Sequence, residues 1–204
     1  NIDVPENSLL AFQKAVESDY GIELDIQLTS DDKLVVFHDT SLKRMTSIDK
    51  DLIDCTYNEL LNYKLLDTDQ TIPLFKDVLN HLNDDTPLII EIKPDGRYIE
   101  TTQRVVELMR DDRGIYNIES FNPFVVYYLK KNETQIVRGQ LAYNYLKDKN
   151  AKANIFLKFI LTNLLMNFIN RPDYIAYEHS NPNNLSFRIV SKILNIKSLN
   201  FFLF

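Results

Sequence analysis

Two acidic side chains lie two residues apart in an otherwise apolar segment near the start of the chain. Glu23 and Asp25 alternate with Ile22, Leu24 and Ile26 in the run IELDIQL. In a β-strand, side chains two residues apart point to the same face, so the two carboxylates share one side. Carboxylates on a buried strand face repel each other and are costly to desolvate without a cation or hydrogen-bond donors. The pattern favours a cation site, and a solvated edge strand is the alternative.

Two further segments place charged residues in or after apolar runs. LVVFHDT ends in His38 and Asp39 and is followed by Arg44; barrel enzymes place catalytic groups just past the carboxyl ends of strands. LIIEIKP puts Glu91 and Lys93 on one strand face. This pattern is equally consistent with a functional site and with a structural salt bridge. Together, the three carboxylates offer oxygen ligands for Mg²⁺ or Ca²⁺, and His38 and Lys93 supply a proton-transfer group and a fixed positive charge. Such a site favours an anionic substrate, first of all a phosphate ester.

The elements that must position these residues alternate short β-rich runs with helical patterns, which is typical of parallel α/β folds. Strands are expected at residues 22–28, 34–37, 87–92, 116–120, 136–139, 174–177 and 199–204. Helices are expected at residues 8–17, 56–66, 75–82, 97–109, 123–131 and 185–194, with a long one within 147–170. An excursion at about 45–72 separates the second and third strands. This order fits either a doubly wound sheet or a (β/α)8 barrel that lacks one strand.

Composition excludes several other functions. The four glycines lie too far apart for a dinucleotide-binding turn or a phosphate-binding P-loop, and the single Cys55 cannot form an internal disulfide or a Cys-x-x-Cys site. A net charge of -6 argues against a nucleic-acid partner. No secretory signal opens the sequence, which favours a cytoplasmic location.

The most apolar stretch, residues 154–169, is shorter than the roughly 20 residues that a membrane-spanning helix needs. We therefore expect no transmembrane segment here. A core helix is the expected structure, and a helix lying on a membrane surface is the alternative.

These motifs resemble the glycerophosphodiester phosphodiesterase family, a (β/α)8 TIM-barrel group related to the phosphatidylinositol-specific phospholipases C. The resemblance rests on the coupled E-x-D, H-D and E-I-K motifs and runs through residues 5–17, 21–46, 72–79, 89–93, 118–123 and 171–177. It implies that Glu23, Asp25 and Glu91 hold one divalent cation, Mg²⁺ or Ca²⁺. It further implies that His38 is a general acid/base and that Lys93 contacts the phosphate or the transition state.

The resemblance also suggests roles for residues outside this cluster. Ser120 and Phe121, at the carboxyl end of a strand, match positions that line the family's substrate pocket. Glu6 and Asn7 match a Pro-Glu-Asn turn that shapes the site. His179 follows a strand closely enough to lie near the pocket mouth, although a structural role is the simpler interpretation.

The function implied by the resemblance is metal-dependent hydrolysis of glycerophosphodiesters to glycerol 3-phosphate and an alcohol, through a cyclic phosphate. Two alternatives stay open. One is a phospholipase C- or D-like enzyme acting on intact lipids, and the other is a catalytically inactive barrel that binds a phosphate ligand or a protein.

The sequence departs from the family pattern at both ends. Family members begin with a strand that ends in a His-Arg-Gly motif, and they continue past the last strand into a Trp-Thr-Val stretch and a helix. Neither feature occurs in these 204 residues, and a complete barrel typically has about 250. We therefore expect residues 1–204 to form a single barrel domain that is incomplete at both ends, without its first strand and the end of its last.

Overall fold

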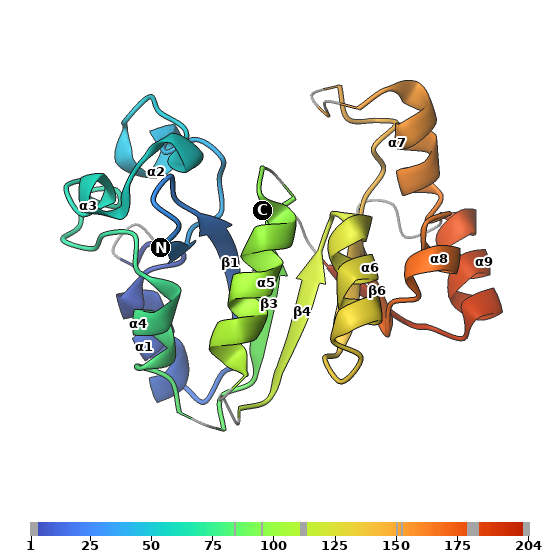
Figure 1. Cartoon of the computed structure of the whole chain (residues 1–204), viewed down its shortest axis with the longest axis horizontal. Helices are drawn as coiled ribbons and strands as arrows, with labels where there is room; N and C mark the ends of the chain where they lie inside the picture. The colour runs from blue at the N-terminus through green and yellow to red at the C-terminus, as the bar shows by residue number, and fades with distance from the viewer. Residues whose placement is uncertain are drawn as a thin grey trace. The chain divides into compact units, whose positions relative to one another are not determined.

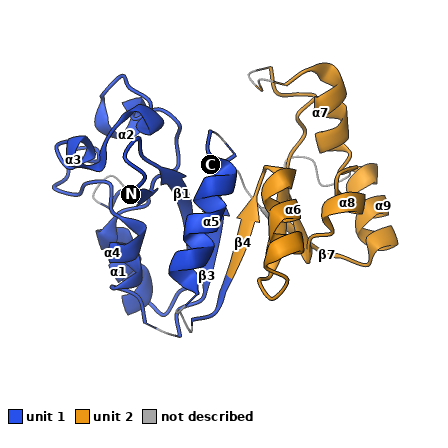
Figure 2. Ribbon diagram, viewed as in Figure 1, with its two compact units in different colours: residues 1–116 blue, residues 117–204 orange. Residues whose placement is uncertain are grey.

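The structure is a computed structural model that describes residues 4–83, 85–94, 96–110, 114–149, 151, 153–178 and 184–201. The chain divides into two compact units, residues 1–116 and 117–204, which we describe separately (Figures 1 and 2). No helix in the described ranges is long and apolar enough to cross a membrane.

The first unit is built on three strands, with β1 between the other two. The strands are β1 (Ile22–Leu28), β2 (Leu34–Val36) and β3 (Leu88–Ile92). β1 pairs in parallel with β3 and antiparallel with β2. The helices of this unit are α1 (Leu9–Glu17), α2 (Lys43–Thr46), α3 (Tyr57–Leu60), α4 (Phe75–Leu79) and α5 (Tyr98–Met109), with a 3₁₀ turn at Leu52–Asp54.

The excursion predicted at about 45–72 forms a subdomain with its own small core. Its buried residues include Leu52, Leu60 and Ile72, which belong to one cluster with Val35 and Phe37 of the β2 segment. The apolar cluster thus anchors the chain that follows β2, including the segment around residue 38.

The second unit contains four parallel strands in sequence order, β4-β5-β6-β7. The strands are β4 (Tyr116–Ser120), β5 (Arg138–Ala142), β6 (Tyr174–Glu178) and β7 (Lys197–Phe201). The helices are α6 (Pro123–Asn132), α7 (Ile155–Thr162), α8 (Asn167–Asn170) and α9 (Leu185–Leu194). Each parallel pair is joined through a helical crossover, as parallel pairing requires.

Most predicted elements are present, but several differ from the prediction. β2 is antiparallel, because only residues 29–33 separate it from β1, which is enough for a hairpin but too short for a parallel crossover. The long helix predicted within 147–170 is two helices, α7 and α8, interrupted where Leu164 takes a positive φ of 59°. The helix predicted at 56–66 ends at Leu60, and it begins with a capping box between Thr56 and Glu59.

Candidate active site

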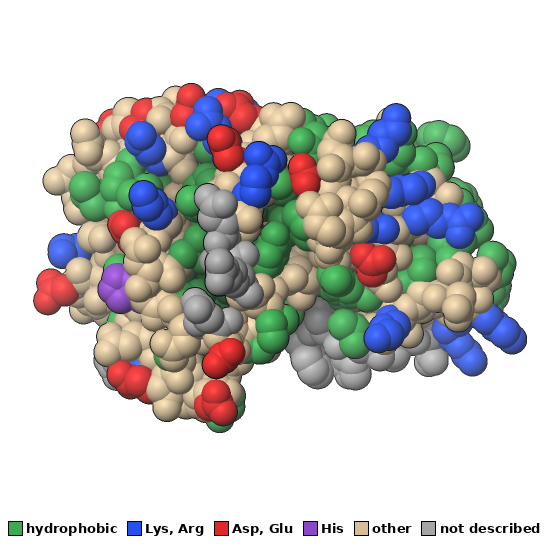
Figure 3. Space-filling view, turned by 60° about the horizontal axis from the view of Figure 1, so that its bottom comes forward, with side chains coloured by type: hydrophobic (Ala, Val, Ile, Leu, Met, Phe, Trp, Pro, Cys, Tyr) green, Lys and Arg blue, Asp and Glu red, His purple; other side chains and the backbone are tan. Residues whose placement is uncertain are grey.

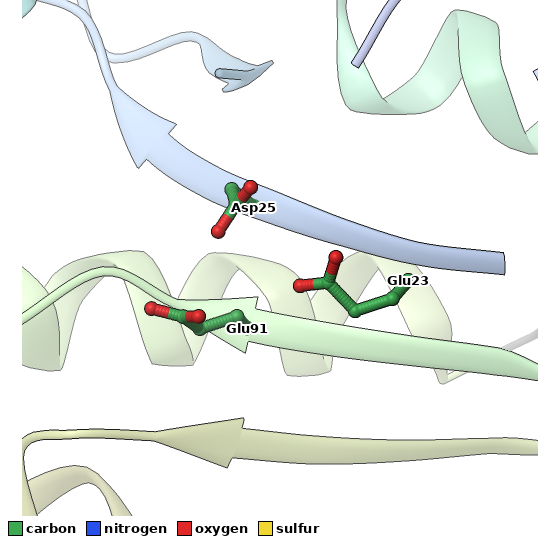
Figure 4. Close-up of side chains that lie close together, drawn as sticks. All are labelled: Glu23, Asp25 and Glu91. Carbon is green, nitrogen blue, oxygen red and sulfur yellow. The ribbon is translucent and has the colours of Figure 1, made fainter. Parts of the chain in front are cut away.

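The acidic residues of β1 and β3 meet because of the register between these two strands. Asp25 lies opposite Glu91 in the parallel ladder, and the backbone N–H of Lys93 donates to the carbonyl of Ile26. Glu23 lies two residues before Asp25 on the same strand face. The side chains of Glu23, Asp25 and Glu91 converge between the two strands (Figure 4).

The three carboxylates form a compact group of oxygen ligands. One oxygen from each of Glu23, Asp25 and Glu91 lies within 4.8 Å of the others. Asp25 and Glu91 are buried, whereas Glu23 is exposed, so the group has two inner members and one member open to solvent. The predicted ligand set is therefore brought together as a cluster that could hold a cation.

Lys93 is held between the two buried carboxylates. Its Nζ lies 3.1 Å from Asp25 Oδ1 and 2.9 Å from Glu91 Oε1, and only 12% of its side chain is exposed. Burial alone would lower the pKa of Lys93, but the two carboxylates outweigh burial and raise its pKa. The ammonium is therefore a fixed positive charge inside the acidic cluster.

Glu91 is a buried carboxylate on β3. Desolvation raises the pKa of Glu91, and the charges of Lys93 and His38 act in the opposite direction. Its Oε1 is buried and pairs with the Lys93 ammonium at 2.9 Å. Three carboxylates that lie this close together, two of them buried, offer hard oxygen ligands, so the donor set fits a divalent cation.

Asn7 supports Asp25 from the segment that precedes α1. Its Nδ2 donates to Asp25 Oδ2 at 2.8 Å, and its Oδ1 accepts from the backbone N–H of Asp25 at 3.4 Å. Asn7 has a φ of 54°, a left-handed conformation that Asn tolerates better than most residues. The predicted site-shaping residue thus contacts a predicted metal ligand directly.

His38 reaches this region by a different route from the one that the sequence suggested. Because β2 runs antiparallel to β1, residues after β2 lie beside the middle of β1; the backbone N–H of Phe37 donates to the carbonyl of Asp25. His38 does follow the carboxyl end of a strand, but that strand is β2, which is antiparallel to β1. The register of the hairpin places His38 beside the strand that carries Glu23 and Asp25.

A chain of polar contacts holds the imidazole of His38. Its Nδ1 lies 2.7 Å from Asp39 Oδ1, and Asp39 Oδ2 accepts from Arg44 Nε at 2.6 Å. Arg44 also pairs with Glu6. Burial alone would raise the pKa of Asp39, but hydrogen bonds from Arg44 and His38 outweigh burial and lower it. Asp39 is thus an ionised carboxylate that orients the imidazole.

Sequence reasoning did not predict the role of Gln27. Its Nε2 donates to the carbonyls of Phe37 at 2.8 Å and Asp39 at 2.9 Å, which are the residues on either side of His38. Gln27 lies on the same strand face as Asp25, and this spacing was the one available signal. The face of β1 that carries the acidic residues therefore also carries Gln27, whose hydrogen bonds hold the His38 segment in place.

A model of the glycerophosphoryl diester phosphodiesterase family matches residues 2–178. The match covers most of the 204 residues. The chain belongs to this phosphodiesterase family. The family resemblance seen in the sequence is thereby confirmed.

Proteins similar to this chain occur in bacteria and animals. The uncharacterized protein YqiK of Bacillus subtilis is 36% identical over 131 residues, which cover 58% of this chain and 53% of that protein. Lysophospholipase D GDPD1 of Rattus norvegicus is 36% identical over 118 residues, which cover 52% of this chain and 37% of that protein. The chain spans about half the length, or less, of these curated relatives.

Solved structures of the family have the same fold. A phosphodiesterase of Oleispira antarctica, solved with the product sn-glycerol 3-phosphate, aligns with a TM-score of 0.76 at 22% identity. The alignment covers 98% of this chain and 80% of that one. The predicted fold class, an α/β fold of the (β/α)8-barrel type, is confirmed by this likeness.

The remaining predicted site residues belong to the second unit. Ser120 is buried, and its Oγ accepts from the backbone N–H of Asn122 at the start of α6. Phe121 packs edge-on against Tyr143, with ring centroids 5.7 Å apart. Their assignment to substrate binding stays a prediction. His179 lies outside the described residues.

Proposed function

We propose that the protein hydrolyses glycerophosphodiesters to glycerol 3-phosphate and an alcohol and that this reaction depends on a divalent cation. Membership of the glycerophosphoryl diester phosphodiesterase family supports this substrate class. The observation that carries the proposal is the cluster of Glu23, Asp25 and Glu91 with a proton-transfer group, His38, close by.

Glu23, Asp25 and Glu91 would hold the cation, which neutralises negative charge on the phosphoryl oxygens when it is bound. Mg²⁺ and Ca²⁺ both suit three carboxylates. Lys93, already fixed beside two of these carboxylates, adds positive charge where the pentacoordinate phosphorus develops negative charge.

His38 would transfer protons in both halves of the reaction. First, the substrate's own glycerol hydroxyl attacks phosphorus, the bond to the alcohol oxygen breaks and a cyclic phosphate forms. Water then opens the cyclic phosphate. Each half takes a proton from the attacking oxygen and gives one to the leaving oxygen, and we assign one of these two transfers to His38. Asp39 orients the imidazole for this task.

The decisive experiment compares His38→Ala with His81→Ala, using glycerophosphocholine as the substrate. His81 is exposed, and its Nδ1 lies 2.7 Å from the carbonyl of Asp77 on α4, so it serves as a matched control. Loss of a general acid/base lowers kcat by roughly 100-fold or more. His38→Ala should show this loss with an unchanged unfolding temperature, and His81→Ala should retain full activity. Activity of His38→Ala within a few-fold of wild type would refute the role.

A chelator provides a second test, of the cation and of catalysis itself. Activity should disappear with the chelator and return with added Mg²⁺ or Ca²⁺. An inactive barrel that binds a phosphate ligand would instead bind glycerol 3-phosphate in a calorimeter and show no turnover under any metal condition.

A second candidate substrate is an intact lysophospholipid. A relative at 36% identity is named a lysophospholipase D, and α7 of this chain exposes apolar side chains that could contact an acyl chain. The ratio of kcat/KM for lysophosphatidylcholine to that for glycerophosphocholine separates the two candidates. A ratio well above one favours the lipid substrate.

A further inference from the structure

Helix α7 is apolar along nearly its whole length and yet is hardly buried. Of its eight residues, IFLKFILT, only Thr162 is buried. The side chains of Ile155 and Phe156 are 72% and 71% exposed, and those of Leu157 and Phe159 are 42% and 49% exposed. We call these four residues the α7 face. An apolar helix normally lies in a protein core or in a membrane, and α7 is not in a core.

The length of α7 limits what this exposure can mean. Eight residues rise about 12 Å, far less than the roughly 30 Å of a bilayer core, so α7 cannot span a membrane. Large exposed apolar patches on a protein mark sites of interaction. The exposed apolar side chains of α7 can enter the boundary between lipid headgroups and acyl chains, where a short helix can lie without crossing the bilayer.

The unit that carries α7 is rich in positive charge. Residues 117–204 contain 11 Lys and Arg against 5 Asp and Glu, whereas residues 1–116 contain 12 against 24. Figure 3 shows Lys and Arg intermixed with hydrophobic side chains over the part formed by the second unit. Lys147 and Lys149 are exposed, and Lys158 of α7 donates to the carbonyl of Asp148 between them at 2.6 Å. Two exposed lysines therefore flank the helix.

We propose that the α7 face docks the protein on the surface of an anionic membrane. Apolar side chains that enter the headgroup region and basic side chains beside them are the two features by which interfacial helices bind anionic lipid. A second copy of the chain is a less favourable partner for the α7 face, because a symmetric contact would bring two positively charged units together.

Docking through α7 would bring predicted substrate-binding residues close to the lipid surface. A small cavity between α7 and the ends of β4 and β5 is lined by Phe121, Leu141, Tyr145, Ile160 and Leu161. It joins the inner side of α7 to the carboxyl ends of these strands, where barrel enzymes bind their substrates. The docking proposal itself does not depend on the catalytic one.

The test is co-sedimentation with vesicles of phosphatidylcholine alone and of equal parts phosphatidylcholine and phosphatidylglycerol. Wild type should bind the mixed vesicles more tightly, and added salt should weaken the binding. The variant Ile155→Ser/Phe156→Ser should lose about 100-fold in affinity, because partial burial of one large apolar side chain is worth about tenfold. The control Tyr20→Ser/Ile115→Ser changes side chains that are 69% and 67% exposed in the first unit, and it should bind as wild type does.

A fluorescence variant tests the same contact without removing it. This sequence contains no Trp, so Phe156→Trp introduces a single reporter. Its emission should shift to the blue when mixed vesicles are added, and that of Tyr20→Trp should not.

Equal binding by wild type and Ile155→Ser/Phe156→Ser would overturn the proposal. So would a failure of wild type to bind, as when another segment of polypeptide or a second copy covers α7. His38→Ala should bind vesicles normally, which separates this result from the test of catalysis.

Discussion

Replacing Lys93 by Met removes an ammonium that lies between the buried carboxylates of Asp25 and Glu91. Lys93 lies 3.1 Å from Asp25 and 2.9 Å from Glu91, and the side chains of these two residues are 4% and 8% exposed. Breaking a buried ion pair by removing one partner costs about 3–5 kcal/mol. Asn7 still donates to Asp25 in the variant, so we expect the lower end, about 3 kcal/mol.

The loss should depend on pH and on divalent cations. Glu91 has a raised pKa in the folded protein, so its ionisation costs stability as the pH rises above the ordinary value of 4.5. The charge of Lys93 opposes the rise in the pKa of Glu91. Without Lys93 the pKa of Glu91 rises further, so the loss of stability caused by its ionisation continues to higher pH. The deficit of Lys93→Met should therefore be smallest in acid and grow toward neutral pH. A bound cation replaces the lost charge, so saturating Mg²⁺ or Ca²⁺ should stabilise the variant more than wild type.

Thermal and urea unfolding in the presence of a chelator measure this loss. A deficit of about 3 kcal/mol corresponds to a fall in the unfolding temperature of roughly 6–12 °C for a chain of this size. The matched control is Lys43→Met, since Lys43 pairs with Asp49 at 3.2 Å and their side chains are 66% and 80% exposed. This control should unfold almost as wild type does. Equal unfolding temperatures for the two variants would refute the charge-balance argument.

Three further predictions concern single residues. Glu91→Gln should weaken binding of a divalent cation at least tenfold by calorimetry; unchanged affinity would remove Glu91 from the ligand set. Gly139→Ala should lower the free energy of unfolding by about 1–3 kcal/mol in a urea titration, because the new Cβ would overlap the Tyr174 ring. In the control Gly21→Ala the new Cβ makes only ordinary contacts, so this variant should unfold as wild type does. The pKa of Asp39 is lowered in the folded protein, so its carboxylate stabilises the fold at pH values above the ordinary pKa of 3.8. The loss of unfolding free energy in Asp39→Asn should therefore disappear as the pH falls through the lowered pKa. A loss that stays constant with pH would contradict this prediction.

The sequence predicted that the carboxylates of Glu23, Asp25 and Glu91 would cluster, because this part of the candidate site depends on alternation along strands. β1 has the predicted bounds, Ile22–Leu28, and Glu91 lies within the predicted third strand. Acidic residues two apart in an apolar strand share a face whatever the tertiary structure. Helices with strong periodic patterns were also predicted well: α9 has the predicted bounds, and α5 differs by one residue.

The sequence did not predict features that depend on contacts between distant segments. Arg44 meets Glu6 across 38 residues, and no local pattern indicates that pairing. The apolar pattern of 154–169 predicted a core helix, but burial depends on what packs against a helix, and α7 is mostly exposed among the described residues. The antiparallel direction of β2 was predictable from the short connection at 29–33, but strand alternation alone does not indicate it.

The parallel register between β1 and β3 is the feature on which the site depends most. Alternation puts Glu23 and Asp25 on one face of β1, but it does not determine which residue of β3 lies beside them. A shift of one residue would move Glu91 and Lys93 to the opposite face and leave Asp25 buried without its ammonium. The register that pairs Asp25 with Glu91 is thus also the one that compensates their charges. The same polar contacts that organise the candidate cation site therefore help to select the strand pairing.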